Sequence, residues 1–180
     1  MRSYIDCVLA LLPFEPEAYR RLDGPPCIYV GHPLVEQRDA LAASAPRETG
    51  PLLVLPGSRR AEIARMTPLY GKTLALLQKD FPDLDVAIPV APNMAGPLAE
   101  ALGDWPLKPR LIDAPGKFAA FRVARAALVT SGVATLELAL AGVPMVVAYR
   151  VAPLESLLRF LITVDSIVSV SYTHLTLPTI

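Results

Sequence analysis

The chain has 180 residues, of which 53% are hydrophobic and 19% charged, so it can build a core and is not intrinsically disordered. Its 17 Lys and Arg residues balance 17 Asp and Glu residues, which argues against a protein that binds nucleic acid by neutralising phosphates. Nineteen prolines divide the chain into short segments and disfavour a bundle of long helices.

Apolar runs and helical segments alternate from the start of the chain. Residues 8–13 and 27–31 are short apolar runs bounded by Pro and Gly, and they predict strands. Residues 15–22, between them, predict a helix. The polar residues 36–39 then lead into the next unit, so we expect a domain boundary after residue 35 and a second domain over residues 36–168.

The second domain repeats the alternation of strand and helix. Its apolar runs predict strands at 52–55, 86–90, 110–112, 127–129 and 145–148. Helices are predicted to begin at Pro68, with Thr67 as the N-cap, and over 94–102, 117–125, 133–141 and 154–161. Strands that are apolar on both faces and separated by helices predict an α/β fold with a doubly wound parallel sheet.

Two further patterns limit the class of protein. Residues 126–148 carry one charge, on Glu137, but two glycines and a proline split them into a buried strand, helix and strand rather than a membrane span. The two cysteines, Cys7 and Cys27, lie in apolar surroundings and predict buried thiols. With His32 as the one plausible histidine ligand, a zinc site has too few ligands, so we expect no metal.

The first candidate site follows the predicted strand 52–55, because ligands of open parallel sheets bind beyond the carboxyl ends of the strands. Gly57 permits a close approach of the backbone, Ser58 can cap a helix, and the free N–H groups there favour an anion. Arg59 adds a permanently charged fork that suits phosphate oxygens. The alternative is an ordinary capped helix with solvated arginines.

The second candidate site follows the predicted strand 127–129. Ser131 and Gly132 turn the chain into a helix that carries Glu137, the single charge of this strand–helix–strand unit. A buried carboxylate needs donors, and a ribose diol supplies two hydroxyls. The alternative is that Glu137 points to solvent.

Three stretches resemble the lipid-A-disaccharide synthase family: residues 55–62 (LPGSRRAE), 130–137 (TSGVATLE) and 144–150 (PMVVAYR). Residues 9–15 (LALLPFE) and 29–33 (YVGHP) are similar to the middle of that family's sequences. The resemblance covers about residues 4–168. It implies a Rossmann-like, GT-B type nucleotide-binding domain that is incomplete, preceded over residues 1–35 by the last elements of an N-terminal acceptor domain.

The resemblance also implies an activity. Members of the family are inverting, metal-independent glycosyltransferases that use no cofactor. They join UDP-2,3-diacylglucosamine to 2,3-diacylglucosamine 1-phosphate, giving the lipid A disaccharide phosphate and UDP, on the cytoplasmic face of the inner membrane of Gram-negative bacteria as peripheral enzymes. Nucleic acid is not an expected partner.

By matching motifs, the resemblance assigns roles to individual residues. Gly57, Ser58 and Arg59 face the diphosphate, and Arg59 has the catalytic role of stabilising the charge of the leaving UDP. The nucleotide-binding residues Ser131, Gly132 and Thr135 line the pocket, with Glu137 on the ribose.

The sequence departs from the family pattern at both ends. We expect most of the N-terminal domain, with its acidic general base, to be missing, so we assign no base and expect a fragment that is inactive alone. Residues 169–180 resemble a translated sequencing adapter and are expected to be a non-native tail; a genuine strand is the alternative. Residues 154–161 predict a core helix, with membrane contact as the alternative.

Other functions remain open on the sequence alone. Another GT-B enzyme acting on a UDP-sugar, such as a peptidoglycan glycosyltransferase or a UDP-sugar epimerase, would share the general pattern of residues 131–137. A non-catalytic nucleotide-binding fragment is the third alternative.

Overall fold

The structure is a computed structural model that describes residues 4–41 and 48–150. The chain divides into two compact units, Met1–Ala40 and Leu41–Ile180. The division falls after residue 40. The helix expected at 154–161 and the expected tail at 169–180 lie outside the described residues.

The first unit is a small strand–helix–strand arrangement. Its elements are β1 (Val8–Ala10), α1 (Glu15–Arg21), β2 (Cys27–Tyr29), the 3-10 helix η1 (Pro33–Gln37) and α2 (Arg38–Leu41), which reaches the start of the second unit. β1 and β2 pair in parallel. The two strands and α1 confirm the prediction, whereas η1 and α2 were not predicted. The expectation of two buried thiols was wrong, since Cys7 is exposed and Cys27 half-buried.

The second unit alternates strands and helices as predicted. Its elements are β3 (Leu52–Leu55), α3 (Arg60–Asp80), β4 (Val86–Pro89), α4 (Ala95–Ala101), β5 (Arg110–Ile112), α5 (Lys117–Val123), β6 (Ala126–Thr130), α6 (Val133–Leu140) and β7 (Met145–Ala148). All the strands are parallel, in the order β5-β4-β3-β6-β7. The strand order therefore reverses direction between β3 and β6, which is the topological switch point of a doubly wound sheet.

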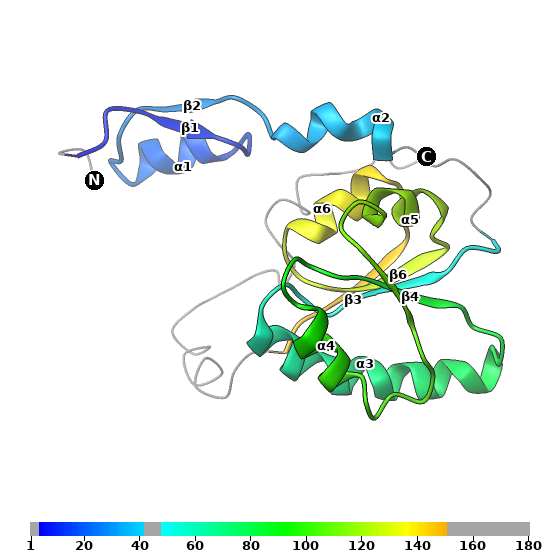
Figure 1. The fold of residues 1–180 in the computed structure, drawn as a ribbon. Coiled ribbons are helices and arrows are strands. Elements are labelled where there is room, and N and C mark those ends of the chain that lie inside the picture. The colour runs from blue at the N-terminus through cyan, green and yellow to red at the C-terminus, as the bar shows by residue number, and fades with distance from the viewer. Residues whose placement is uncertain (1–3, 42–47, 151–180) are drawn as a thin grey trace. The chain divides into compact units, whose positions relative to one another are not determined.

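Helices cover both faces of this sheet. In Figure 1, α3 and α4 lie on one face, and α5 and α6 lie on the other. Alternate residues of β3 pack against opposite helical layers. Val54 belongs to the hydrophobic cluster that includes residues of α3, and Leu53 to the cluster that includes residues of α5 and α6. This arrangement explains why all four residues of β3 are buried and why its sequence, Leu-Leu-Val-Leu, shows no polar alternation.

The long helix α3 begins earlier than predicted. The expected start at Thr67 and Pro68 was wrong, because Pro68 lies inside a continuous helix over Arg60–Asp80. The Thr67 hydroxyl donates to the carbonyl of Ile63 at 2.6 Å, and the Thr67 carbonyl accepts from the indole N–H of Trp105 at 3.1 Å. Pro disfavours helix interiors by about 3 kcal/mol, so the packing of the buried residues around it, among them Met66, Thr67 and Tyr70, has to offset that cost.

The segment 126–148 forms β6, α6 and β7, as its glycines and proline predicted. Within residues 4–41 and 48–150, no helix combines the length and the apolar character needed to cross a membrane.

The first prediction concerns the bond that ties α3 to the end of β6. Tyr70 is buried, and its hydroxyl lies 3.2 Å from the hydroxyl of Thr130. Tyr70→Phe removes this hydrogen bond and is expected to lower the free energy of unfolding by about 1 kcal/mol in urea denaturation at neutral pH. Tyr149→Phe, at a partly exposed tyrosine, is the matched control and should change it by much less.

The same variant has an expected signature at high pH. Burial raises the pKa of Tyr70 above its ordinary value of 10.0, although the hydrogen bond to Thr130 opposes the shift. Above about pH 10 the unfolded chain therefore loses this proton while the folded chain keeps it, and stability falls as pH rises. Tyr70→Phe should lose less stability than the wild type above pH 10; equal losses would contradict the proposed cause.

Candidate functional site

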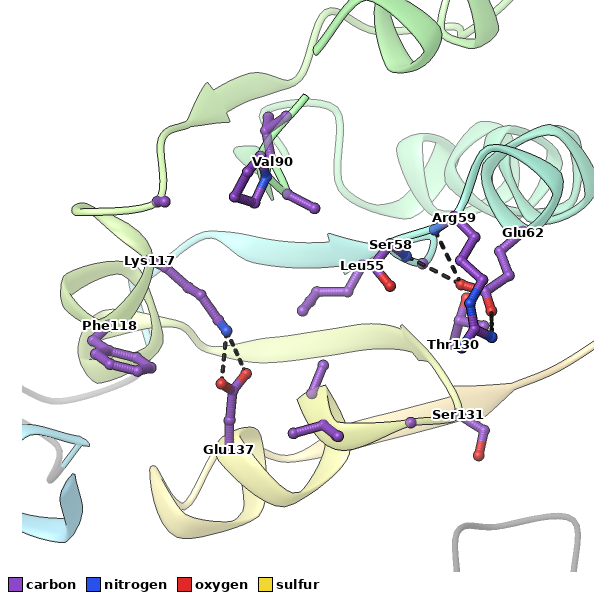
Figure 2. Close-up of a pocket in the computed structure, with 17 residues that line it drawn as sticks. Leu55, Ser58, Arg59, Glu62, Val90, Lys117, Phe118, Thr130, Ser131 and Glu137 are labelled. Carbon is purple, nitrogen blue, oxygen red and sulfur yellow. Dashed lines mark hydrogen bonds and ion pairs between the residues drawn. The ribbon is translucent and has the colours of Figure 1, made fainter. Parts of the chain in front are cut away.

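One cavity lies at the carboxyl ends of the central strands. It has a volume of about 610 Å³, within the range of small-molecule sites, and is shown in Figure 2. Its walls are the turns that follow four strands, together with the starts of α5 and α6. The residues that line it are Leu55, Gly57, Ser58, Arg59, Glu62, Val90, Ala91, Pro92, Ala114, Lys117, Phe118, Thr130, Ser131, Gly132, Val133, Ala134 and Glu137.

Six of the seven candidate residues line this one cavity: Gly57, Ser58, Arg59, Ser131, Gly132 and Glu137. The structure thus brings the turn after β3 and the turn after β6 to a shared hollow. β3 and β6 are neighbours in register, with Leu55 opposite Val129, so their ends must lie close together. The sequence indicated both turns but could not show that the two strands are adjacent.

Thr135 is the candidate that does not line the cavity. It is fully buried, and both its N–H and its hydroxyl donate to the carbonyl of Gly132, at 3.1 and 2.6 Å. Thr135 therefore closes the first turn of α6. Gly132 has φ +152° and ψ −165°, a conformation essentially restricted to glycine, and this turn directs α6 away from the strand end.

Glu137 is buried in the wall of the cavity and does not point to solvent. Its side chain is 10% exposed, and its two carboxylate oxygens lie 2.7 and 2.6 Å from the Lys117 ammonium. Figure 2 shows the pair bridging α5 and α6. The ammonium also lies 5.4 and 5.6 Å from the ring centroids of Phe118 and Phe121, within cation–π range.

Arg59 lies at the other end of the cavity and is largely exposed. It is the N-cap of α3, in extended conformation, so Ser58 precedes the cap and does not provide it. Glu62 supplies the missing acceptor: its carboxylate accepts from the N–H groups of Ser58 and Arg59 and from the Arg59 guanidinium, at 3.1, 3.3 and 3.1 Å. Leu55 lies between this group and the Lys117–Glu137 pair (Figure 2).

Reasoning from the sequence missed two charged residues of the cavity. Glu62 stands at the third helical position after the N-cap, a spacing at which Glu accepts from cap N–H groups, and this signal was available. Lys117 comes from a different helix and is 20 residues from Glu137, so no local pattern indicated their contact. With Arg59 and Glu137 they are the four charged residues that line the cavity, and their formal charges cancel.

In the described parts of the chain, no cluster of three or more His, Cys, Asp and Glu side chains could hold a metal ion. The cavity instead offers N–H donors at the start of a 21-residue helix, a guanidinium and a buried carboxylate. This donor and acceptor set suits an anion at one end and hydroxyl groups at the other.

The strand order and the cavity at its switch point define a class: the chain carries a Rossmann-like α/β domain of the kind found in GT-B proteins. Comparison with known proteins identifies the family. The family model described as lipid-A-disaccharide synthetase matches residues 1–177, and the chain belongs to this family.

Similar proteins named lipid-A-disaccharide synthase occur in several bacteria. The relative from Nitrobacter winogradskyi is 53% identical over 176 residues, which are 93% of this chain and 44% of the relative. The relative from Rhodopseudomonas palustris strain BisB18 is 52% identical over the same shares of the two chains. The relative from Ruegeria pomeroyi is 40% identical over 95% of this chain and 47% of its own length. The chain thus spans less than half the length of these relatives.

The ion pair in the cavity wall generates the second prediction. Lys117→Met leaves the buried Glu137 carboxylate without its cation and is expected to lower the free energy of unfolding by about 1–3 kcal/mol in urea denaturation. The double variant Lys117→Met with Glu137→Gln removes both charges and should recover part of that loss.

The double variant shows whether Lys117 and Glu137 stabilise each other. Purely additive losses in the double variant would show that the two side chains do not stabilise each other. Lys108→Met, at an exposed lysine that does not line the cavity, is the control for removing a positive charge.

Proposed function

We propose that the protein is an inverting, metal-independent glycosyltransferase of lipid A biosynthesis, and that residues 52–150 provide part of its site for the UDP-linked donor. The observation that supports this most directly is the shared cavity, which places Arg59 and the start of α3 at one end and Glu137 at the other. Membership of the family and the names of the relatives supply the substrate class.

In this proposal the donor's diphosphate lies against the N–H groups of Ser58 and Arg59 and the Arg59 guanidinium. Gly57 lets the backbone turn close to the diphosphate, with φ +119°. The positive end of the α3 dipole and the guanidinium favour the negative charge that the diphosphate gains as its bond to the sugar breaks. Arg59 thereby acts on the leaving group and stabilises the transition state more than the bound donor.

The uridine ribose lies at the Glu137 end, with Ser131 and Gly132 lining the wall beside it. A carboxylate accepts hydrogen bonds from both ribose hydroxyls, and its burial makes each bond stronger than it would be in water. Lys117 holds the carboxylate in place from the other side.

The remaining parts of the activity belong to the whole protein. We propose that it joins UDP-2,3-diacylglucosamine to 2,3-diacylglucosamine 1-phosphate as a peripheral protein of the cytoplasmic face of the inner membrane. Residues 1–35 then form the end of the acceptor domain, and residues 169–180 a non-native tail. We assign no general base to this chain.

The third prediction tests the diphosphate end. Arg59→Ala is expected to weaken the binding of UDP to the 180-residue chain by about 10- to 100-fold in calorimetry, the range for losing hydrogen bonds to a charged group. Arg60→Ala is the matched control, because Arg60 is the next residue, is exposed and does not line the cavity. Equal effects of the two variants would contradict a specific role for Arg59.

The fourth prediction tests the ribose end. Wild-type protein should bind UDP more tightly than 2′-deoxy-UDP, and Glu137→Gln should reduce that ratio about threefold or more, because a neutral amide is the weaker acceptor. Binding of ADP as tight as that of UDP would contradict the proposal. Preference for UDP-N-acetylglucosamine over the diacylated donor would favour another GT-B enzyme.

A further inference from the structure

The N–H donors at the start of α3 already have an acceptor. Oε2 of Glu62 accepts from the backbone N–H groups of Ser58 and Arg59, at 3.1 and 3.3 Å, and Oε1 accepts from the Arg59 guanidinium at 3.1 Å. We call these three donors the anion seat. A single carboxylate of the chain itself accepts from all three donors of the anion seat (Figure 2).

Gly57 makes this arrangement possible. A Cβ atom at residue 57 would lie 2.6 Å from both Cβ and Oε2 of Glu62, closer than non-bonded atoms approach. The absence of a side chain at this position therefore gives the carboxylate room to fold back over the turn.

We propose that Glu62 is an internal competitor for the anion seat: it fills the seat when the cavity is empty and leaves it when a nucleoside diphosphate binds. The inference rests on the proposed function, because the diphosphate would use the same donors. Each backbone N–H has a single hydrogen to give, so a carboxylate and a phosphate cannot both take its full bond.

The exposure of Arg59 makes the exchange feasible. The Arg59 side chain is 82% exposed, so water screens its ion pair with Glu62, whose own side chain is 18% exposed, and the pair contributes little. The Lys117–Glu137 pair, at 31% and 10% exposure, is more deeply buried and is the harder of the two to separate.

The diphosphate carries more negative charge than the Glu62 carboxylate, and this difference favours its binding at the anion seat. With Glu62 seated, the formal charges of the four charged residues lining the cavity sum to zero, and the Arg59 guanidinium is paired with a carboxylate. When the Glu62 carboxylate swings into solvent, Arg59 and the helix N-terminus become available to the more highly charged diphosphate. The affinity for the diphosphate is therefore reduced by the competition with Glu62.

The test is Glu62→Gln in the 180-residue chain, with binding of UDP and of uridine measured by calorimetry. The variant removes the competing charge and is expected to bind UDP about threefold to tenfold more tightly at low salt, while uridine affinity stays the same. The gain should shrink at high salt, since exposed charges are screened. Glu100→Gln, at an exposed glutamate that does not line the cavity, is the charge-matched control.

The outcomes are distinct. Unchanged or weaker UDP binding by Glu62→Gln would overturn the inference and make Glu62 a positioning residue for Arg59. Failure of the wild type and of the variant to bind either UDP or uridine would overturn the proposed function as well. If the variant does not fold, the test is made by NMR on the wild-type protein. UDP, but not uridine, should then shift the amide resonances of Ser58 and Arg59. Unshifted amide resonances would overturn the inference.

Discussion

The site depends on the adjacency of β3 and β6 at the point where the sheet reverses its order. The two strands run in parallel and in register, and the helices that follow them leave toward opposite faces of the sheet (Figure 1). Two chain segments that diverge from neighbouring strand ends leave a hollow between them. The packing that fixes β3 between the two helical layers therefore also fixes the separation of the two turns, after β3 and after β6, that border the hollow.

The cavity contains two ion pairs that differ in physical character. Lys117 and Glu137 connect two helices within a mostly buried wall, and separating them would leave a carboxylate with little access to water. Arg59 and Glu62 lie at a helix start near solvent, where water can replace either partner. The Lys117–Glu137 pair is thus costly to separate, whereas the Arg59–Glu62 pair can rearrange more easily. An account based on net charge alone would treat the two ends as equivalent.

Local pattern predicted most of the fold because the strands of a sheet covered on both faces are short, uninterrupted apolar runs. β3 and β6 were recognised for this reason. The start of α3 was missed because a proline usually marks a first helical turn, and the packing of the buried face that holds the helix together on both sides of Pro68 is not visible in the local pattern. At the site, residues on the two turns were recognisable. The role of Thr135 in closing a turn and the contact of Lys117 with Glu137 depend on packing, which spacing along the chain does not specify.

The two turns also show why one loop motif is insufficient evidence for a phosphate site. The turn after β3 has the features expected of one: a glycine with positive φ, backbone N–H groups at the start of a helix and an arginine. Yet Glu62, which follows Ser58 by four residues, accepts from these donors, so the motif supplies its own acceptor. The buried carboxylate that follows the second turn faces the same hollow from a helix on the other side of the sheet, and it too has a partner within the chain, Lys117. Under the proposed function it is the pairing of the two turns, rather than either motif alone, that suits a molecule with an anionic and a hydroxyl-bearing end.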